Sequence, residues 1–440
     1  MGLYGRGGVK NHYICPRNCL KMKVYKFGGA SVKDADGVRN AAAIVAAERG
    51  DLIVVVSAMG ETTNALETLC NRWFHKNGNV ESVFAEVRRY HETVAAELFG
   101  RGTVLPAVEK LFGQLREILD GETSMSYDYE YDRIIPFGEL LSTAVVAACL
   151  KEQEPSLRWI DVRKCLKSDD NYRNGHIDLV ASGEWCEKTF TFADARVYVT
   201  QGFIAGTATN QTTTLGREGS DYTAALLANL LGAEGVTIWK DVPGVMNADP
   251  KLYLETAVIP RLSYREAIEL SFFGAKVIHP KTIKPLQNKN IPLYVRSFLC
   301  PEEDGTVICE WEEKLHLPPI FIDKTDQLLL TLTPRDFSFI AEEELSRIFG
   351  LLAQYRLKLN LLQTSAINFT LLVDYHAALF ERFIAALKTE YKVLYNKDVK
   401  LITIRHFDEE TVRRLTLHKR VLVEQRSRLT ARFVVEDSKL

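Results

Sequence analysis

The sequence predicts an α/β fold with a mostly parallel sheet, followed by a smaller α+β region. Two observations support the sheet: short β-branched runs alternate with helical segments through the first 300 residues, and polar or glycine-rich loops follow the strands. Such alternation is typical of parallel strands covered by helices. A change of composition after about residue 300 indicates that the tail is a separate module.

Length and composition narrow the class of protein. The chain of 440 residues is longer than one hydrophobic core usually supports, so two or three domains are expected. Its net charge of -2 offers no basic field for nucleic acid or anionic lipid, which favours small-molecule or protein partners. The eight cysteines are scattered and form no CxxC pair, so neither a zinc site nor a disulfide framework is indicated. We therefore expect a protein of the reducing cytoplasm. We recognise no apolar window long enough to span a membrane.

The elements of the first 300 residues follow one another in a regular order. We interpret residues 1–21 as a disordered leader, because they are rich in Gly, Asn and Lys and lack a signal-peptide run. Residues 64–120 are expected to form long helices, a helical subdomain over one end of the sheet. The alternating strands and helices are expected at 24–27, 38–48, 52–56, 196–200, 223–231, 236–239 and 292–295.

The tail is predicted to hold two small α+β units. Proline and glycine at 301–305 and 318–319 are typical of a linker. The first unit is expected as strand, helix, strand, strand and helix at 328–332, 342–355, 357–362, 368–373 and 377–388. A shorter set is expected as strand, helix and strand at 400–404, 409–422 and 429–435. Units of this kind pair sheets or bind regulators.

The most informative segment, residues 212–223, joins a polar loop to an Ala- and Leu-rich helix. Arg217 lies in the loop, and Ser220 and Asp221 are expected to open the helix. A helix start offers unpaired N–H groups and the positive end of a dipole, and a guanidinium can bind a carboxylate through two hydrogen bonds. The segment therefore predicts an anion site. The alternative is that Asp221 only caps the helix and Arg217 only solvates a turn.

A glycine pair follows the first strand directly. In the segment from Lys26 to Ser31, Gly28 and Gly29 would let backbone N–H groups approach a phosphate, and Lys26 would offset negative charge that develops in phosphoryl transfer. The alternative is an ordinary tight turn. The segment does not match the Walker pattern, and no GxGxxG follows a strand.

Further polar groups follow other predicted strands and helix starts. Ser57 and Thr63 follow the second strand, at the edge where open α/β sheets bind ligands, although Thr63 could simply cap a helix. Glu139 could pair with an amino group or only complement a helix dipole. Asp241 lies at another strand end, and Lys276 is a candidate phosphate contact near His279, which we interpret as structural.

Taken in this order, the segments resemble the aspartate kinases of the amino-acid kinase superfamily over about residues 22–300. The resemblance rests on six segments: 26–31, 57–64, 138–143, 161–163, 212–223 and 274–280. It implies a three-layer αβα sandwich that transfers the γ-phosphoryl group of ATP to the side-chain carboxylate of L-aspartate. This is the first step of the aspartate-family pathway to lysine, threonine, methionine and diaminopimelate. A carboxylate nucleophile is already ionised at neutral pH, so no general base is needed.

The resemblance also implies a role for individual residues. The expected catalytic residues are Lys26 and Asp221. The expected aspartate-binding residues are Ser57, Thr63, Glu139, Tyr172, Arg217 and Ser220. The expected ATP-binding residues are Lys26, Gly28, Gly29, Ser31, Lys240, Asp241, Met246, Lys251 and Lys276. Mg²⁺ would bridge phosphate oxygens, with no protein residue assigned as its ligand.

Four positions depart from the family pattern. Ala30 replaces a usual Thr and removes a hydroxyl donor near phosphate, and Glu218 replaces a usual Gly and adds a negative charge near the anion site. Lys240 stands where Thr is common and Met246 where an aromatic residue is common. We therefore expect activity or substrate affinity to differ from the family norm.

The tail at 320–440 resembles the paired ACT modules with which these kinases sense lysine or threonine and form dimers. The resemblance implies a homodimer or higher oligomer and an amino-acid effector. The acidic run at 342–344 and Ala366 depart from the usual effector site, so inhibition by lysine is a hypothesis. Two other hypotheses remain: a kinase of the same superfamily that acts on glutamate or acetylglutamate, and a non-catalytic amino-acid sensor.

Overall fold

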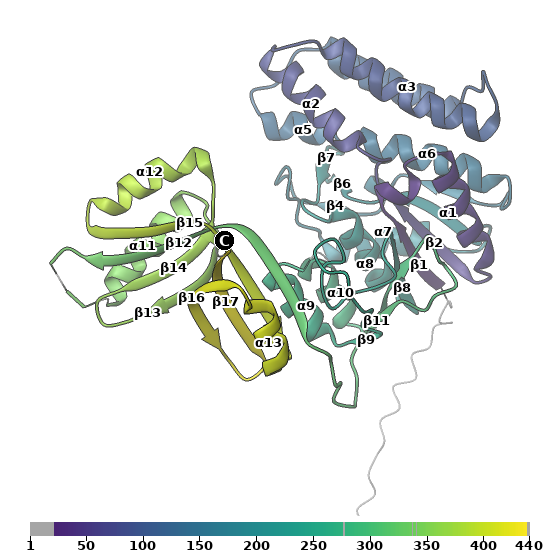
Figure 1. Ribbon diagram of the computed structural model, residues 1–440. Helices are drawn as coiled ribbons and strands as arrows, with labels where there is room; N and C mark the ends of the chain where they lie inside the picture. The colour runs from purple at the N-terminus through teal and green to yellow at the C-terminus, as the bar shows by residue number, and fades with distance from the viewer. Residues whose placement is uncertain (1–21, 276–277, 337, 340, 438–440) are drawn as a thin grey trace, which may run out of the picture. The chain divides into compact units, whose positions relative to one another are not determined.

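The computed structural model describes residues 22–275, 278–336, 338–339 and 341–437 (Figure 1). Two compact units divide the chain between Thr237 and Ile238. The domain limits expected at 22–300 and 320–440 stay a prediction, and the expected leader at 1–21 lies outside the described residues.

A parallel sheet forms the centre of the first unit. Its strands follow the order β3 (Arg158–Ile160), β5 (Val197–Gln201), β2 (Asp51–Val56), β1 (Met22–Phe27) and then β8 (Gly235–Lys240). Strand β2 is apolar after Asp51, β1 alternates apolar residues with Lys23 and Lys26, and both strands are buried along nearly their whole length. Strands of this kind are buried on both faces. The pairs β1 with β2, β2 with β5 and β3 with β5 are all parallel, which confirms the predicted fold class.

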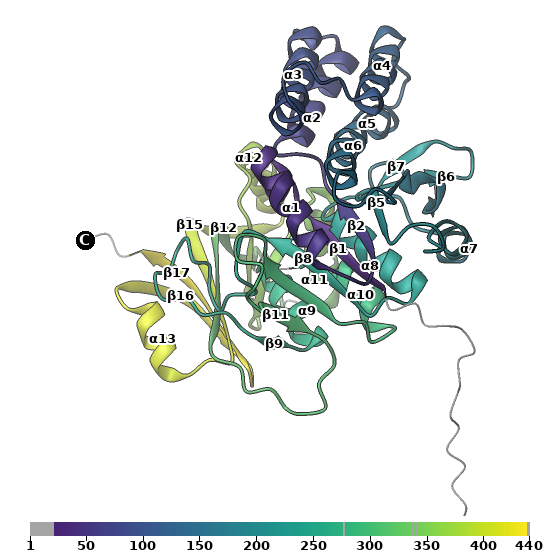
Figure 2. The same ribbon diagram turned by 90° about the vertical axis from the view of Figure 1, so that its right-hand side faces the viewer.

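Two pairs of helices cover this sheet (Figure 2). The first pair is α1 (Ala35–Ala47) with α6 (Phe137–Lys151), and α6 packs on β2, β3 and β5. The second pair is α7 (Leu179–Thr189) with α8 (Gly219–Leu231), and α8 packs on β1 and β2. Helices, sheet and helices form the three-layer sandwich that the resemblance implied. A small separate sheet joins β4 (Lys167–Ser168), β6 (Ile204–Thr207) and β7 (Thr212–Thr214).

Long helices form the subdomain that was predicted from residues 64–120. They are α2 (Thr62–His75), α3 (Val80–Phe99) and α4 (Pro106–Asp120), and α5 (Tyr127–Ile134) follows them (Figure 2). Their starts are set locally: Pro106 occupies the first turn of α4, and the Asn79 side chain caps α3 by accepting from the N–H of Ser82.

One stretch of helix is long and apolar enough to cross a membrane, contrary to our reading of the sequence. It runs over Tyr127–Lys151 and has a mean hydropathy of 1.6 in its best window. Within the structure 89% of that window is buried, because α6 lies against the central sheet. Length and composition alone do not distinguish a membrane span from such a core helix.

The second unit contains a six-stranded antiparallel sheet. Its order is β13 (Leu359–Thr364), β14 (Phe369–Asp374), β12 (Ile320–Pro334), β15 (Tyr391–Arg405), β17 (Thr430–Asp437) and β16 (Lys419–Arg426). A core of leucine, phenylalanine and isoleucine side chains lies under α11 (Glu342–Gln354) and α12 (Ala377–Lys388). The unit also holds the neighbouring strands β10 (Leu293–Ser297), β11 (Thr306–Ile308) and β9 (Arg261–Leu262), with α9 (Tyr264–Phe273) and α10 (Pro280–Gln287).

The prediction of a helix at 409–422 was wrong in its second half. Helix α13 spans only Glu409–Thr416, and the residues after it form strand β16. β16 pairs antiparallel with β17 along its whole length, and it is an edge strand whose side chains are largely exposed. Its charged residues favour a helix locally, but the hydrogen bonds to β17 decide the structure. The predicted strand at 400–404 is likewise only the end of the longer β15.

Candidate active site

The loop after β1 packs tightly against the loop after β2. A Cβ atom on Gly29 would lie 2.7 Å from the backbone oxygen of Ala58, so only glycine fits there. The N–H of Gly60 donates to the oxygen of Gly29 at 3.1 Å and joins the two loops. A Cβ on Gly28 would meet only the Nζ atom of Lys26, at 3.5 Å. The glycine pair therefore leaves open backbone directly beside a lysine ammonium group, as a phosphate cradle requires.

Lys26 and Asp221 form a nearly buried ion pair. The Lys26 Nζ atom lies 2.6 Å from Asp221 Oδ1, and the two side chains are 11% and 6% exposed. Lys26 comes from β1 and Asp221 from the first turn of α8, so the contact brings together the two segments that the sequence singled out. Charges in such a site are weakly screened, and each influences the other strongly.

Helix α8 starts one residue earlier than predicted. It begins at Gly219, and the cap position is Glu218, which has a left-handed φ of 52° and makes no side-chain cap bond. Ser220 and Asp221 lie within the first turn instead of capping it, which corrects the expectation that they open the helix. Glu218, which replaces a glycine usual in the family, thus has a backbone conformation that favours glycine. A Cβ on Gly202 would lie 2.6 Å from the Cα of Ser220, so the helix start fits closely against the turn after β5.

Glu139 is a buried carboxyl group at the start of α6. It is 3% exposed, and its Oε1 atom accepts a bond of 3.4 Å from the N–H of Ala58. Its Oε2 atom has no hydrogen-bond partner among the described residues. Burial raises the pKa of Glu139 to about 8, against the opposing effects of backbone hydrogen bonds and of the Lys26 charge. An unpaired buried carboxyl oxygen near a lysine fits a bound ammonium group, which would restore the charged form.

The hydroxyl groups at the predicted site differ in their burial and in whether they already form a hydrogen bond within the protein. The Ser31 hydroxyl donates to the oxygen of Gly28 at 2.6 Å and thus belongs to its own turn. Ser57 and Thr63 are half-buried. Sequence reasoning missed Thr62, whose buried Oγ1 has no hydrogen-bond partner among the described residues. Thr62 directly precedes Thr63, the residue that the resemblance selected. Burial is the feature that distinguishes Thr62 from Thr63.

Arg217 and Tyr172 lie at the more open part of the first unit. Arg217 is exposed and has no ion-pair partner within the described part of the chain, so its guanidinium is available for a carboxylate. Tyr172 is half-buried and packs edge-on against Tyr129, with ring centroids 5.2 Å apart. Ala30, which lacks the hydroxyl usual in the family, is exposed.

The remaining residues expected to bind ATP belong to the second unit. Asp241 follows β8 directly, as predicted, and is exposed, while Lys240 and Met246 are half-buried. Lys251 is exposed, and its N–H donates to Asp249 Oδ1 at 2.9 Å. Lys276 lies outside the described residues. His279 caps α10, since its Nδ1 atom accepts from the N–H of Lys281, in agreement with a structural role.

The fit of magnesium to this site depends on the carboxylate and phosphate oxygens that could hold it. The described part of the chain contains no group of three or more His, Cys, Asp or Glu side chains able to hold a metal. Magnesium retains several waters and commonly uses one or two carboxylates together with substrate phosphates. The donor set of the protein is therefore compatible with magnesium delivered together with ATP and with no separate protein cage.

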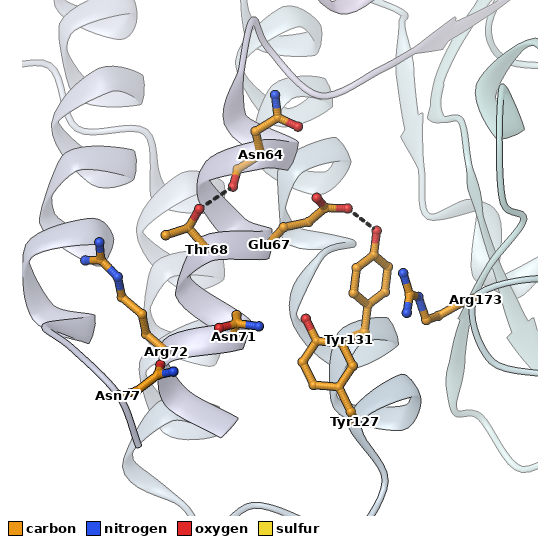
Figure 3. Close-up of a pocket in the computed structure, with 9 residues that line it drawn as sticks. All are labelled: Asn64, Glu67, Thr68, Asn71, Arg72, Asn77, Tyr127, Tyr131 and Arg173. Carbon is orange, nitrogen blue, oxygen red and sulfur yellow. Dashed lines mark hydrogen bonds between the residues drawn. The ribbon is translucent and has the colours of Figure 1, made fainter. Parts of the chain in front are cut away.

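A hollow with a polar lining lies elsewhere, between α2 and α5 (Figure 3). It measures about 650 Å³, and its polar lining includes Glu67, Arg72, Tyr127, Tyr131 and Arg173. None of the residues predicted for the active site lines it. The proposed site is defined by its buried ion pair and close-packed glycines, and this hollow is separate from it.

Comparison with known proteins identifies the family of the chain. The profile of the amino acid kinase family matches residues 21–297. Lysine-sensitive aspartokinase 3 of Escherichia coli is 33% identical over 370 residues, which are 80% of this chain and 78% of that protein. The chain therefore belongs to the amino acid kinase family and, within it, to the aspartokinases.

Solved structures give the same result. E. coli aspartokinase III in complex with lysine and aspartate, a T-state, matches with a TM-score of 0.82 and 28% identity, over 95% of this chain and 96% of that one. The R-state of the same enzyme with aspartate and ADP matches with a TM-score of 0.77 and 27% identity, over 94% and 96% of the two chains. The fold predicted from the sequence is thus confirmed over both the sandwich and the tail.

Proposed function

We propose that the first unit binds L-aspartate and the phosphoryl group of ATP around the Lys26–Asp221 pair. As an aspartokinase, the chain is a phosphotransferase whose acceptor is a carboxyl group. The observation that carries the assignment of the site is this ion pair, 2.6 Å long, beside the open backbone of Gly28. It supplies a cation, oriented by a carboxylate, where a transferring phosphoryl group would need charge neutralisation.

Three groups are proposed to hold the aspartate. Arg217 binds the α-carboxylate through two hydrogen bonds, because its guanidinium is exposed and has no ion-pair partner among the described residues. Glu139 accepts the ammonium group with its unpaired Oε2 atom. Ser57, Thr63, Tyr172 and Ser220 complete the pocket, and the aspartate side chain then points towards Lys26.

The chemistry requires positioning and no proton abstraction. The attacking oxygen of the aspartate side chain is ionised at neutral pH, so it attacks the γ-phosphorus directly while the bond to the ADP oxygen breaks. Lys26 stabilises the negative charge on the phosphoryl oxygens, and Asp221 holds the Lys26 ammonium group in place. The N–H groups of Gly28 and Gly29 support the same oxygens, whereas the Ser31 hydroxyl stabilises the turn.

We propose that Lys240, Asp241, Met246, Lys251 and Lys276 bind the nucleotide. Magnesium, when bound with ATP, would neutralise phosphate charge and orient the γ-phosphoryl group. The use of ATP is supported by the ADP complex of the related E. coli enzyme. Magnesium rests on the general requirement of phosphoryl transfer for charge neutralisation.

A coupled assay of ADP release tests this function. The purified chain is given ATP and magnesium with L-aspartate, L-glutamate, N-acetylglutamate or no amino acid. We expect ADP release with aspartate alone. Release with glutamate or acetylglutamate would assign the chain to another substrate within the family, and aspartate binding without ADP release would identify a sensor.

We also propose that lysine is an effector and that the tail forms a homodimer in the cytoplasm. The related E. coli enzyme is described as lysine-sensitive, and its T-state contains lysine. Turnover at subsaturating aspartate is measured across a lysine titration, with threonine as the matched control. A fall in turnover with lysine alone supports the proposal, whereas an unchanged rate contradicts it. Sedimentation measures the oligomeric state independently.

A further inference from the structure

Asp132 is a fully buried carboxylate on α5 that no role described above uses. It has no exposed surface, and it accepts three hydrogen bonds from two other segments of the chain. Its Oδ2 atom accepts from the N–H of Arg173 at 2.8 Å and from the N–H of Thr214 at 2.9 Å. Its Oδ1 atom accepts from the Thr214 hydroxyl at 2.8 Å. Leaving such donors unpaired inside a protein is costly.

The two segments that Asp132 holds are those that carry Tyr172 and Arg217. The N–H of Arg173 follows Tyr172 directly, and Thr214 ends strand β7, three residues before Arg217. The segments also touch each other, since the N–H of Gly175 donates to the oxygen of Thr214 at 2.9 Å. One carboxylate thus fixes two neighbouring loops at the points from which their proposed substrate contacts extend.

The loop around Arg173 needs this support. Arg173 has a left-handed φ of 66°, an unfavourable conformation for a residue other than glycine. Its side chain lies over Tyr131 (Figure 3), with the guanidinium carbon 4.4 Å from the ring centroid. It also forms an ion pair with Asp128 at 3.1 Å. Because the side chain is anchored on α5 as well, the whole turn is fastened to that helix.

We propose that Asp132 is a positioning residue for the aspartate site. It sets the placement of Tyr172 and Arg217 through the backbone, and it does not touch the substrate itself. Its carboxylate accepts from the N–H of Arg173 in a loop and from the N–H of Thr214 in strand β7. A side chain that keeps an oxygen at the same place should therefore preserve the site. The inference rests on the proposed roles of Tyr172 and Arg217.

Burial raises the pKa of Asp132 to about 6, and the hydrogen bonds from Arg173 and Thr214 oppose this rise. The group is therefore mainly ionised at neutral pH. An asparagine side chain would keep one oxygen for the two N–H groups and could donate its own N–H to the Thr214 hydroxyl. An alanine would leave both N–H groups without their acceptor.

Three variants and the wild type test the proposal. We expect Asp132→Ala to raise the KM for aspartate by about tenfold or more, with kcat and the KM for ATP changed by less than about threefold. Asp132→Asn should remain within about threefold of the wild-type KM, since it retains the acceptor. Glu130→Gln is the matched control: Glu130 is as fully buried on the same helix, but its hydrogen-bond donors among the described residues are Ser124 and Arg133.

The outcomes separate positioning from general stability. A KM for aspartate that is unchanged in Asp132→Ala, or raised equally in Glu130→Gln, overturns the proposal, and so does an Asn variant as impaired as Ala. If Asp132→Ala fails to fold, Thr214→Val decides: a raised KM for aspartate with unchanged kcat supports the proposal, and an unchanged KM overturns it. A wild type without aspartate-dependent activity would instead refute the function, before any variant is compared.

Discussion

At the scale of single residues, the proposed site combines a permanent ion pair with a carboxyl group whose charge depends on its ligand. Lys26 and Asp221 neutralise each other within 2.6 Å, while Glu139 lies close enough for the Lys26 charge to affect its pKa. In the proposed binding mode, aspartate brings an ammonium group to Glu139 and a carboxylate towards Lys26. The charges of the proposed site therefore complement a ligand with one ammonium group and two carboxylates, as aspartate has.

Removal of the Lys26 ammonium group should affect turnover more than binding. We expect Lys26→Met to lower kcat by about a hundredfold or more, because charge stabilisation is lost in the transition state. Lys23→Met is the matched control, since Lys23 lies on the same strand and pairs with Glu48 at 2.8 Å, outside the proposed site. Steady-state kinetics measure both variants. Equal losses in the two would show that Lys26 serves only the stability of β1.

Glu139 should make aspartate binding depend on pH. Its pKa is raised to about 8 in the free protein, so at pH 7 the group is mainly protonated and the ammonium of the substrate must displace that proton. We therefore expect the KM for aspartate to fall as pH rises from about 6.5 to about 8, where the carboxylate forms unaided. Glu139→Gln should raise the KM and remove this dependence. A wild-type KM that is flat over this range would contradict the role of Glu139.

At this scale the sequence indicated which residue types the site needs, but it did not show which side chains are free to bind a ligand. The resemblance selected Lys26, Asp221 and Glu139, and the structure places the first two in contact and the third within reach of the Lys26 charge. It could not show that the Ser31 hydroxyl is used by its own turn or that Thr62 is the buried threonine. Both facts depend on side-chain direction, which sequence spacing does not determine.

At the scale of elements, the site depends on loops that touch across the end of the sheet. The loop after β1 meets the loop after β2 where Gly29 lies against Ala58, and α8 starts against the turn that contains Gly202. These contacts allow no extra methyl group, so a small substitution should move a whole loop. The mostly parallel pairing follows from the sequence pattern, but the strand order and such close approaches do not.

A methyl group on Gly29 should therefore disturb the phosphate loop. We expect Gly29→Ala to lower kcat/KM for ATP by about tenfold or more and to destabilise the fold, since its Cβ would lie 2.7 Å from a backbone oxygen. Gly113→Ala is the control, because no atom lies within 4 Å of its added Cβ in helix α4. It should stabilise the protein by about 1 kcal/mol, as measured by denaturant unfolding. Full activity in Gly29→Ala would contradict the close packing.

The tail shows where local pattern fails at this scale. The residues of β16 carry enough charge to resemble a helix surface, yet they form an edge strand on β17. The strands β12 and β15 are both 15 residues long, while only short apolar parts of them were recognised. Polar stretches of a long strand gain their structure from the neighbouring strand, which the sequence does not identify.

At the scale of the whole molecule, a buried ion cluster joins distant parts of the second unit. Glu266 of α9 accepts two hydrogen bonds from Arg405 at the end of β15, of 2.9 and 2.7 Å, and lies 3.2 Å from His406. Although burial alone would raise it, hydrogen bonds from His406 and Arg405 hold the pKa of Glu266 at about 2. The cluster thus links the segment before α10 to the antiparallel sheet of the tail.

Loss of this carboxylate should destabilise the second unit. Glu266→Ala leaves Arg405 buried without its main partner, and we expect a cost of about 3–5 kcal/mol in unfolding free energy. In the wild type the contribution is present above the ordinary glutamate pKa and is lost as pH falls towards about 2, because protonation breaks the pair. Glu269→Ala, which removes an outer partner 3.5 Å from Arg405, should cost much less. Denaturant unfolding measures the unfolding free energy of both variants from pH 7 down to acidic pH. Equal losses in Glu266→Ala and Glu269→Ala would contradict the proposed role of Glu266.

The most direct measurement of the central claim is a crystal structure with L-aspartate and ADP bound. We predict that the aspartate lies with its α-carboxylate on Arg217, its ammonium on Glu139 and its side chain towards Lys26. Aspartate bound away from these residues, for example in the hollow between α2 and α5, would contradict the proposed site.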